Sequence, residues 1–328
     1  MAESLSGPQG PVAASGARPQ PVVSRRALLR GLGAGAAALA AAPALVSGAP
    51  AGAAAAATAG LPRAATVAGL HGATLLLAAF PSGTTWAQAI AAWEGYTGTT
   101  IKAAKVYYRP GVFPTSIGAQ VKTYLNEGIK ALLAFKPAFN PPSQADLAAL
   151  EKSLKMFRAA GLTATVTLWQ EAQNVMSAAQ FRRVVHYYGP MIRNYYPVAY
   201  DAFGSAGPSS WTNYYPGDSF VDVVAIDYYA PSYLKGITLD VLGRIADSAS
   251  PPKPFGIWEM GNSAGGVIPT QSQMQSYFGY LQSFMAGRLQ AGKANAELVW
   301  FNGNGVDTIS SSSDYRVPLW DSLVSATS

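Results

Sequence analysis

The chain of 328 residues contains no cysteine and only two histidines, His71 and His186. The lack of cysteine excludes thiol nucleophiles, thiolate metal ligands and disulfides. Neither histidine has a second one four positions away, so the paired-histidine zinc motif is absent. The serine tract at residues 310–313 lacks the Gly-x-Ser-x-Gly elbow, and neither histidine is placed to complete a serine triad. We therefore expect no metal site and no cofactor.

Charge is also sparse, since charged residues make up 12% of the chain. The formal net charge is +6, but the first 51 residues hold four arginines against one glutamate. The remainder carries 19 basic and 16 acidic residues. Its lysines and arginines are scattered without a stripe, and no nucleic-acid-binding motif is present, so no nucleic-acid partner is expected.

Residues 1–51 have the pattern of a twin-arginine signal peptide. Arg25 and Arg26 precede an apolar, alanine-rich stretch at residues 31–46, and small residues near Ala51 suit signal peptidase. An uncleaved membrane anchor is the alternative, but this stretch is short and consists largely of alanine and glycine. No later segment reaches the roughly 18 uninterrupted apolar residues that span a membrane. We expect a secreted protein with no stable membrane insertion after cleavage, and a disordered alanine-rich spacer at residues 52–68.

Residues 69–328 match the usual size of one (β/α)8 TIM barrel. Apolar runs that predict eight strands alternate with amphipathic segments, and no glycine-rich nucleotide fingerprint follows the first run. This alternation favours a parallel sheet, and eight units favour the closed barrel over an open sheet. The expected strands are residues 74–79, 101–107, 131–135, 164–169, 198–202, 221–228, 255–259 and 298–302. The expected helices include residues 116–126, 144–160, 178–194, 239–248 and 271–290, with Ser143 and Thr270 as N-caps and Gly161 as a C-terminal stop.

Two of the seven glutamates lie at the ends of predicted strands. Glu171 lies in LTATVTLWQEAQN, residues 162–174, and Glu259 lies in KPFGIWEMGN, residues 253–262. Each follows a short apolar run that places it where a buried strand opens onto the active face of a barrel. Cleavage of a glycosidic bond needs two such carboxyls, one protonated beside the leaving oxygen and one ionised. The pair therefore predicts a catalytic site for a polysaccharide or oligosaccharide.

Three segments resemble strands of glycoside hydrolase family 26 and its relatives in clan A. They are VDVVAIDYYAP at residues 221–231, KPFGIWEMGN, and ELVWFNGNG at residues 297–305, in matching order and spacing. The resemblance, which covers about residues 74–325, implies a retaining glycoside hydrolase acting on a β-linked polysaccharide such as mannan, xylan or glucan. Glu171 would be the acid/base and Glu259 the nucleophile.

The residue before the expected acid/base departs from this pattern. Clan A usually has asparagine there and family 26 has histidine, whereas this chain has Gln170, whose amide can still donate a hydrogen bond. The departure leaves open a barrel that binds carbohydrate without cleaving it, or a surface protein without a sugar site. The glycan, endo or exo action and the oligomeric state also stay open.

Further residues are candidates for contacts with the sugar. The resemblance implies that the Tyr228 hydroxyl contacts the nucleophile and that Trp300 forms an aromatic platform, although each could instead be packing. Either Tyr228 or Tyr229 must point away from the barrel interior. Asp222 and Asp227 flank the core of the same strand, where a structural or surface role is favoured. Other candidates by strand position are Gln170, Lys136, Trp169, Trp258, Asn174 and Asn262.

Overall fold

A computed structural model describes residues 71–204, 208–262, 268–303 and 307–327. These ranges belong to one compact unit, Ala55–Ser328. The predicted signal peptide at residues 1–51 and the spacer at 52–68 lie outside the described residues. Within the described ranges, no helix combines the length and the apolar character needed to cross a membrane.

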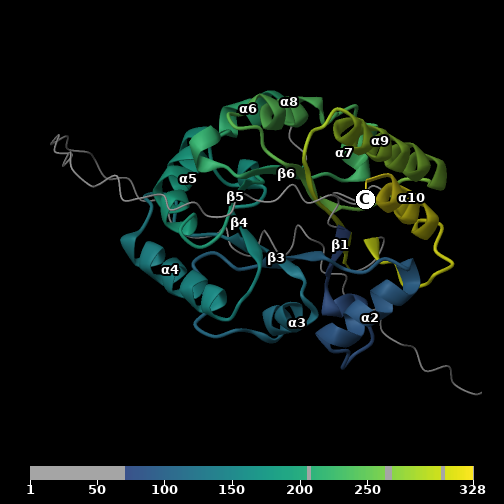
Figure 1. The fold of residues 1–328 in the computed structure, drawn as a ribbon, viewed down its shortest axis with the longest axis horizontal. Coiled ribbons are helices and arrows are strands. Elements are labelled where there is room, and N and C mark those ends of the chain that lie inside the picture. The colour runs from purple at the N-terminus through teal and green to yellow at the C-terminus, as the bar shows by residue number, and fades with distance from the viewer. Residues whose placement is uncertain (1–70, 205–207, 263–267, 304–306, 328) are drawn as a thin grey trace, which may run out of the picture. The chain divides into compact units, whose positions relative to one another are not determined.

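Eight parallel strands close into a barrel in sequential order, β1 to β8, which confirms the predicted (β/α)8 TIM barrel (Figure 1). Parallel neighbours need crossover connections, and the helices that supply them cover the outside of the sheet. The strands are β1 (His71–Leu75), β2 (Ala103–Tyr107), β3 (Lys130–Phe135), β4 (Ala164–Leu168), β5 (Val198–Tyr200), β6 (Val223–Asp227), β7 (Phe255–Met260) and β8 (Asn295–Asn302).

The helices alternate with these strands around the barrel (Figure 1). The α-helices are α2 (Trp86–Thr97), α3 (Ala119–Glu127), α4 (Gln144–Ala159), α5 (Ala178–Ile192), α6 (Pro208–Tyr214), α7 (Ala230–Leu234), α8 (Asp240–Ser248), α9 (Gln271–Gln290) and α10 (Val317–Thr327). Among the described residues, the short 3-10 helices with defined bounds are η1 (Leu77–Ala79), η2 (Ala172–Asn174) and η3 (Asp218–Phe220).

Helix boundaries follow local signals in the sequence. The side chains of Ser143 and Thr270 accept hydrogen bonds from backbone N–H groups three residues later, so both predicted N-caps are confirmed. Gly161 follows α4 with φ +83°, a left-handed conformation that glycine adopts without a Cβ clash.

The first strand is the clearest error in the predicted boundaries, because residues 74–79 were expected and β1 is His71–Leu75. β1 pairs with β8 as far as Leu75 opposite Asn302, where β8 ends. Beyond that point the chain turns into η1. The extent of a strand is thus set by its neighbour, which the local apolar pattern does not reveal.

Candidate active site

Glu259 lies inside the barrel on β7 and is fully buried. The Tyr107 hydroxyl donates to its Oε1 at 2.6 Å, and the Tyr229 hydroxyl donates to its Oε2 at 2.6 Å. The Lys105 ammonium donates to Oε1 at 3.0 Å. Lys105 and Tyr107 belong to β2, so the carboxylate is held from across the barrel. Three donors on one carboxylate favour its ionised form.

Two further carboxylates surround the same ammonium. The Lys105 Nζ lies 2.7 Å from Asp227 Oδ1 and 2.8 Å from Asp201 Oδ2. Asp227 ends β6, and a register shift in the pairing of β6 with β7 sets it opposite Glu259. Asp201 directly follows β5. All three side chains, Lys105, Asp201 and Asp227, are fully buried.

The pKa values in this cluster are displaced. Burial alone lowers the pKa of Lys105, but the charges of Asp201, Asp227 and Glu259 raise it well above its ordinary value. Burial, aided by its carboxylate neighbours, raises the pKa of Asp227 well above the usual range. Burial also raises the pKa of Asp201 to about 6, with Lys105 opposing the shift. Such displaced values are typical of functional sites.

Glu171 is positioned mainly by the backbone after β4. Among the described residues, Trp169 (φ 53°) and Glu171 (φ 55°) are the non-glycine residues with positive φ. Each such conformation costs about 1 kcal/mol, so the turn between them must be held by its surroundings. Gly204, after β5, lies directly against the carboxylate, because a Cβ there would be 2.1 Å from Glu171 Oε1. Unlike Glu259, Glu171 is partly exposed.

The charges of both predicted catalytic glutamates affect the pKa values of the same neighbouring side chains. The charge of Glu171, like that of Glu259, contributes to the raised pKa values of Asp201 and Asp227. Lys136 follows β3. Burial is the largest effect on its pKa and lowers it, while the charges of Glu171 and Glu259 raise it. Its Nζ lies 5.9 Å from the centre of the Trp169 ring. The mouth of the barrel therefore gathers Glu171, Glu259 and Lys136, as the strand positions predict.

Tyr229, not Tyr228, contacts Glu259. The Tyr228 hydroxyl donates to the Ile237 carbonyl, and its ring lies against Tyr277 of α9, outside the strands. The predicted contact of Tyr228 with the nucleophile is therefore wrong. Successive side chains point to opposite sides of an extended chain, and Tyr229 is the one directed inward.

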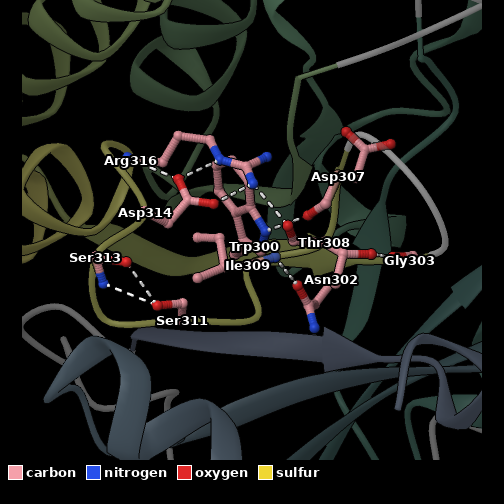
Figure 2. A network of polar contacts seen from close by, with 10 residues as sticks. All are labelled: Trp300, Asn302, Gly303, Asp307, Thr308, Ile309, Ser311, Ser313, Asp314 and Arg316. Atoms are coloured by element: carbon pink, nitrogen blue, oxygen red, sulfur yellow. Dashed lines mark hydrogen bonds and ion pairs between the residues drawn. The ribbon is translucent and has the colours of Figure 1, made fainter. Parts of the chain in front are cut away.

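The predicted platform, Trp300, faces the helices instead of the mouth. It is fully buried, stacks on Phe278 of α9 at 5.9 Å and packs edge-on against Trp320 of α10. Its indole donates to the Asp307 carbonyl at 3.1 Å. Figure 2 shows it in a polar network that includes Arg316, whose guanidinium lies 5.9 Å from the ring. Trp300 therefore holds the Asp307 backbone and packs against the helices, and it offers no surface to a sugar.

Trp258 points into the barrel interior and is fully buried. Its indole donates to Glu297 Oε2 at 3.0 Å, and Lys130 Nζ lies 2.5 Å from Glu297 Oε1. Lys130 begins β3, so this group closes the end of the barrel opposite the mouth, which we call the floor. The position of Trp258 beside Glu259 in the sequence thus does not bring it to the substrate.

The remaining candidates lie around the mouth. Trp169 is 8% exposed and its indole donates to the Pro137 carbonyl at 2.7 Å. Gln170 is partly exposed, yet its buried Oε1 accepts no hydrogen bond from the described residues. Asn174 is exposed at the end of η2, and Asn262 is buried after β7.

Asp222 has the structural role that the sequence favours, and Asp227 is buried and accepts a hydrogen bond from Lys105, so it is not a surface residue. Asp222 pairs with Arg193 at 2.8 Å and accepts from the Val198 N–H, at the start of β5. Asp227 belongs to the Lys105 cluster. In the described part of the chain, no group of three or more histidines, aspartates or glutamates could hold a metal ion.

Sequence reasoning missed three members of the cluster, Lys105, Tyr107 and Asp201. Lys105 carried a usable signal, because a lysine in the middle of the apolar run AAKVY is a charge inside a buried strand. Such a lysine must be paired, and its partners are then sought at the ends of other strands. Asp201, directly after the run VAY, is one of the residues that this search would have found.

No protein-family model matches the sequence, and no curated protein is significantly similar to it. Solved structures do share its fold. A family 26 glycoside hydrolase domain of an endo-β-mannanase/endo-β-glucanase from Prevotella bryantii aligns over 77% of this chain and 88% of its own, with TM-score 0.50 and 12% identity. The catalytic domain of a family 26 endo-β-1,4-mannanase from Bacillus sp. JAMB-750 aligns over 73% and 79%, with TM-score 0.51 and 14% identity. A further match is a family 26 protein of Muricauda sp. MAR_2010_75, over 79% and 85%, with TM-score 0.50 and 13% identity.

Proposed function

We propose that the protein is a secreted glycoside hydrolase that cleaves a β-linked polysaccharide with retention of configuration. The observation that carries this proposal is the environment of Glu259, a buried carboxylate that accepts hydrogen bonds from Tyr107, Tyr229 and Lys105 at the mouth of the barrel. Fixed in this way, it is suited to attack an anomeric carbon. The fold shared with family 26 mannanases and the three resembling segments support the same reaction class.

Glu171 is the proposed acid/base. It protonates the leaving oxygen while Glu259 forms the glycosyl-enzyme, and it then takes a proton from the water that releases the sugar. Its partial exposure suits this role, because the group must exchange protons in each half of the cycle. Gly204 leaves the space that its carboxylate occupies. No cofactor is needed for this mechanism.

The substrate is a glycan of the mannan, xylan or glucan type. Two of the similar structures are those of endo-β-mannanases, so mannan-type chains are the first to be tested. Gln170, Trp169 and Lys136 would line the site, with Asn174 and Asn262 further along the loops. Tyr229 takes the place of Tyr228 in this proposal, and Trp258 and Trp300 have no part in it.

The reaction can be tested with paired variants on a substrate that the parent cleaves. Glu259→Ala should abolish activity, and azide should restore it with inverted configuration, because the anion attacks from the vacated face. Glu171→Ala should retain activity on substrates with activated leaving groups, and azide rescue should retain configuration. Wild-type activity of both variants would reject the site.

A second candidate function is carbohydrate binding without cleavage. It is favoured by Gln170, which departs from the family pattern and leaves a buried amide oxygen without a hydrogen bond from the described residues. Glycan binding by the parent with no release of reducing ends, across a panel of β-glycans, would support this alternative.

Export is tested separately. The paired arginines support the twin-arginine route, so changing Arg25 and Arg26 together to lysine should keep the protein in the cytoplasm. Normal secretion of that double variant would reject the route while leaving the enzyme proposal untouched.

A further inference from the structure

The cluster around Lys105 holds more carboxylates than it can neutralise. The Lys105 ammonium lies 2.8, 2.7 and 3.0 Å from oxygens of three carboxylates, Asp201, Asp227 and Glu259. All four side chains are buried, with at most 1% exposure. Fully ionised, the cluster would carry two uncompensated negative charges away from water, which is strongly unfavourable. It must therefore hold at least one additional proton.

The hydrogen bonds indicate where such a proton resides. Glu259 already accepts donors on both oxygens, from Tyr107, Tyr229 and Lys105. Among the described residues, neither Asp227 Oδ2 nor either carboxylate oxygen of Asp201 accepts a hydrogen bond, although Asp201 Oδ2 lies 2.8 Å from the Lys105 ammonium. A proton on an oxygen that receives no donor displaces nothing, whereas a proton on Glu259 would displace one of its donors.

We propose that Asp201 and Asp227 form a proton-holding pair that keeps Glu259 ionised, and that Asp201 takes over as the counter-ion of Lys105 when Glu259 forms its covalent intermediate. Asp201 is thus a positioning residue that acts through Lys105. The inference rests on the proposed function, because only a covalent step consumes the charge of Glu259.

The two aspartates differ in a way that fits these roles. Burial, followed by the charges of Asp201 and Glu259, raises the pKa of Asp227 well above its usual range, which favours its protonated form. The pKa of Asp201 is raised only to about 6, because the Lys105 charge opposes burial. The charged groups that act on Asp201 are Lys105 of β2, Asp227 of β6, Glu259 of β7 and Glu171 after β4.

The covalent step changes the balance of this cluster. One oxygen of Glu259 bonds to the anomeric carbon while the glycosidic bond breaks, and the leaving oxygen takes the Glu171 proton. Glu259 then carries no charge, and Lys105 keeps one ionised partner only if Asp201 is deprotonated. Water next attacks the anomeric carbon, its proton passes to Glu171, and the bonding electrons return to Glu259. The loss of a neighbouring negative charge should therefore lower the pKa of Asp201 in the intermediate.

The direct test is a carbon-13 NMR titration of the Asp201 carboxyl in the parent and in Glu259→Gln, whose neutral amide imitates the esterified nucleophile. The expected midpoint is about 6 in the parent. In the variant it should fall, since a like charge is removed while Lys105 stays. The matched control is Asp314, which pairs with Arg316 outside the Lys105 cluster and should show the same titration in both proteins. An unchanged Asp201 midpoint, or an Asp201 that is ionised down to about pH 4 in the parent, would overturn the inference.

The functional test compares Asp201→Asn with Asp222→Asn. We expect Asp201→Asn to lower kcat about 10- to 100-fold with little change in KM, because it affects the covalent intermediate and not the sugar contacts. The ionisation near pH 6 should also disappear from the acid limb of the kcat/KM profile. Asp222→Asn should keep the parental profile. A parental profile for Asp201→Asn would count against the inference.

The two proposals fail in different ways. The NMR titration needs no substrate, so a coupled Asp201 in a chain that cleaves no glycan would reject the proposed function and leave the proton-holding pair standing. Cleavage with retention but no coupling of Asp201 to Glu259 would reject the pair alone.

Discussion

Two buried glutamate–lysine pairs lie at opposite ends of the same barrel. At the mouth, Glu259 shares Lys105 with two aspartates and receives two tyrosine hydroxyls. At the floor, Glu297 forms a one-to-one ion pair with Lys130 and accepts one hydrogen bond from the Trp258 indole. Both glutamates are no more than 2% exposed. Burial and pairing alone therefore do not distinguish a reactive site from a structural one.

The difference lies in the balance of charge. The floor pair is neutral, and its lysine is partly exposed, so it behaves like an ordinary structural ion pair. The mouth cluster has three carboxylates for one ammonium, an excess that costs stability and that a purely structural site has no reason to retain. We therefore assign chemistry to the mouth and support of the barrel to the floor.

The sharpest test of this comparison is the pair Glu259→Gln and Glu297→Gln. Glu259→Gln should lower kcat by about 10⁴-fold or more, because it removes the proposed nucleophile. It should keep or raise the melting temperature, since it relieves excess charge. Glu297→Gln should lower the free energy of unfolding by about 1–3 kcal/mol, because it leaves Lys130 without its partner. Its kcat at a temperature where it stays folded should be near parental. Equal effects of both changes on kcat would remove the distinction.

Much of the mouth could be predicted from sequence, because its glutamates follow apolar strands. A residue at a strand end needs only the strand order to be placed at the mouth, so Glu171 and Glu259 came together as expected. The direction in which a side chain points from a strand was harder to predict from the sequence. Register shifts where β7 pairs with β6 and β8 alter which residues face inward. Trp258 points inward but lies at the floor, and Trp300 points toward the helices, so neither side chain reaches the mouth.

Residues that act across the barrel were the hardest to predict. Lys105 reaches Glu259 from β2, 154 positions away in the sequence, and no local pattern links the two. The same holds for Lys130 and Glu297 at the floor. Only closure of the barrel brings such pairs together, so the charge balance that separates mouth from floor emerges from the three-dimensional structure.

Two glycines, one at the mouth and one at the floor, leave space that neighbouring side chains or backbone occupy. A methyl group on Gly204 would displace the Glu171 carboxylate, so Gly204→Ala should lower kcat about 100-fold with little loss of stability. Gly256, at the floor end of β7, lies against the Glu297 carbonyl and the Trp258 indole. Gly256→Ala should instead destabilise the fold by about 1–3 kcal/mol through overpacking. Steady-state kinetics and thermal unfolding measure both. A fully active Gly204→Ala enzyme would show that Gly204 does not position Glu171.

Two adjacent tyrosines allow a test with a smaller expected effect on kcat, because each substitution removes only one hydroxyl. Tyr229→Phe removes a hydroxyl that donates to Glu259, and a hydrogen bond to a charged group is worth about 1.5–3 kcal/mol. We expect kcat to fall roughly 10- to 100-fold if that bond acts in the transition state. Tyr228→Phe removes a hydroxyl bonded to the Ile237 carbonyl, so it should lower the melting temperature and leave kcat near parental. The reverse result would restore Tyr228 as the nucleophile contact.

The smallest expected effect concerns Lys136. Unlike Lys105, this lysine forms no ion pair with any described residue. Its half-buried ammonium lies over the Trp169 ring, and the charges of Glu171 and Glu259 partly offset the effect of burial on its pKa. A donor held there without a carboxylate partner is available to sugar hydroxyls. Lys136→Met keeps the length and apolar packing of the side chain, so it should raise KM about three- to tenfold through loss of one charge-assisted hydrogen bond. Lys152→Met, an exposed position on α4, is the matched control and should leave KM unchanged. An equal KM for the parent and Lys136→Met, on a glycan that the parent cleaves, would exclude Lys136 from the substrate site.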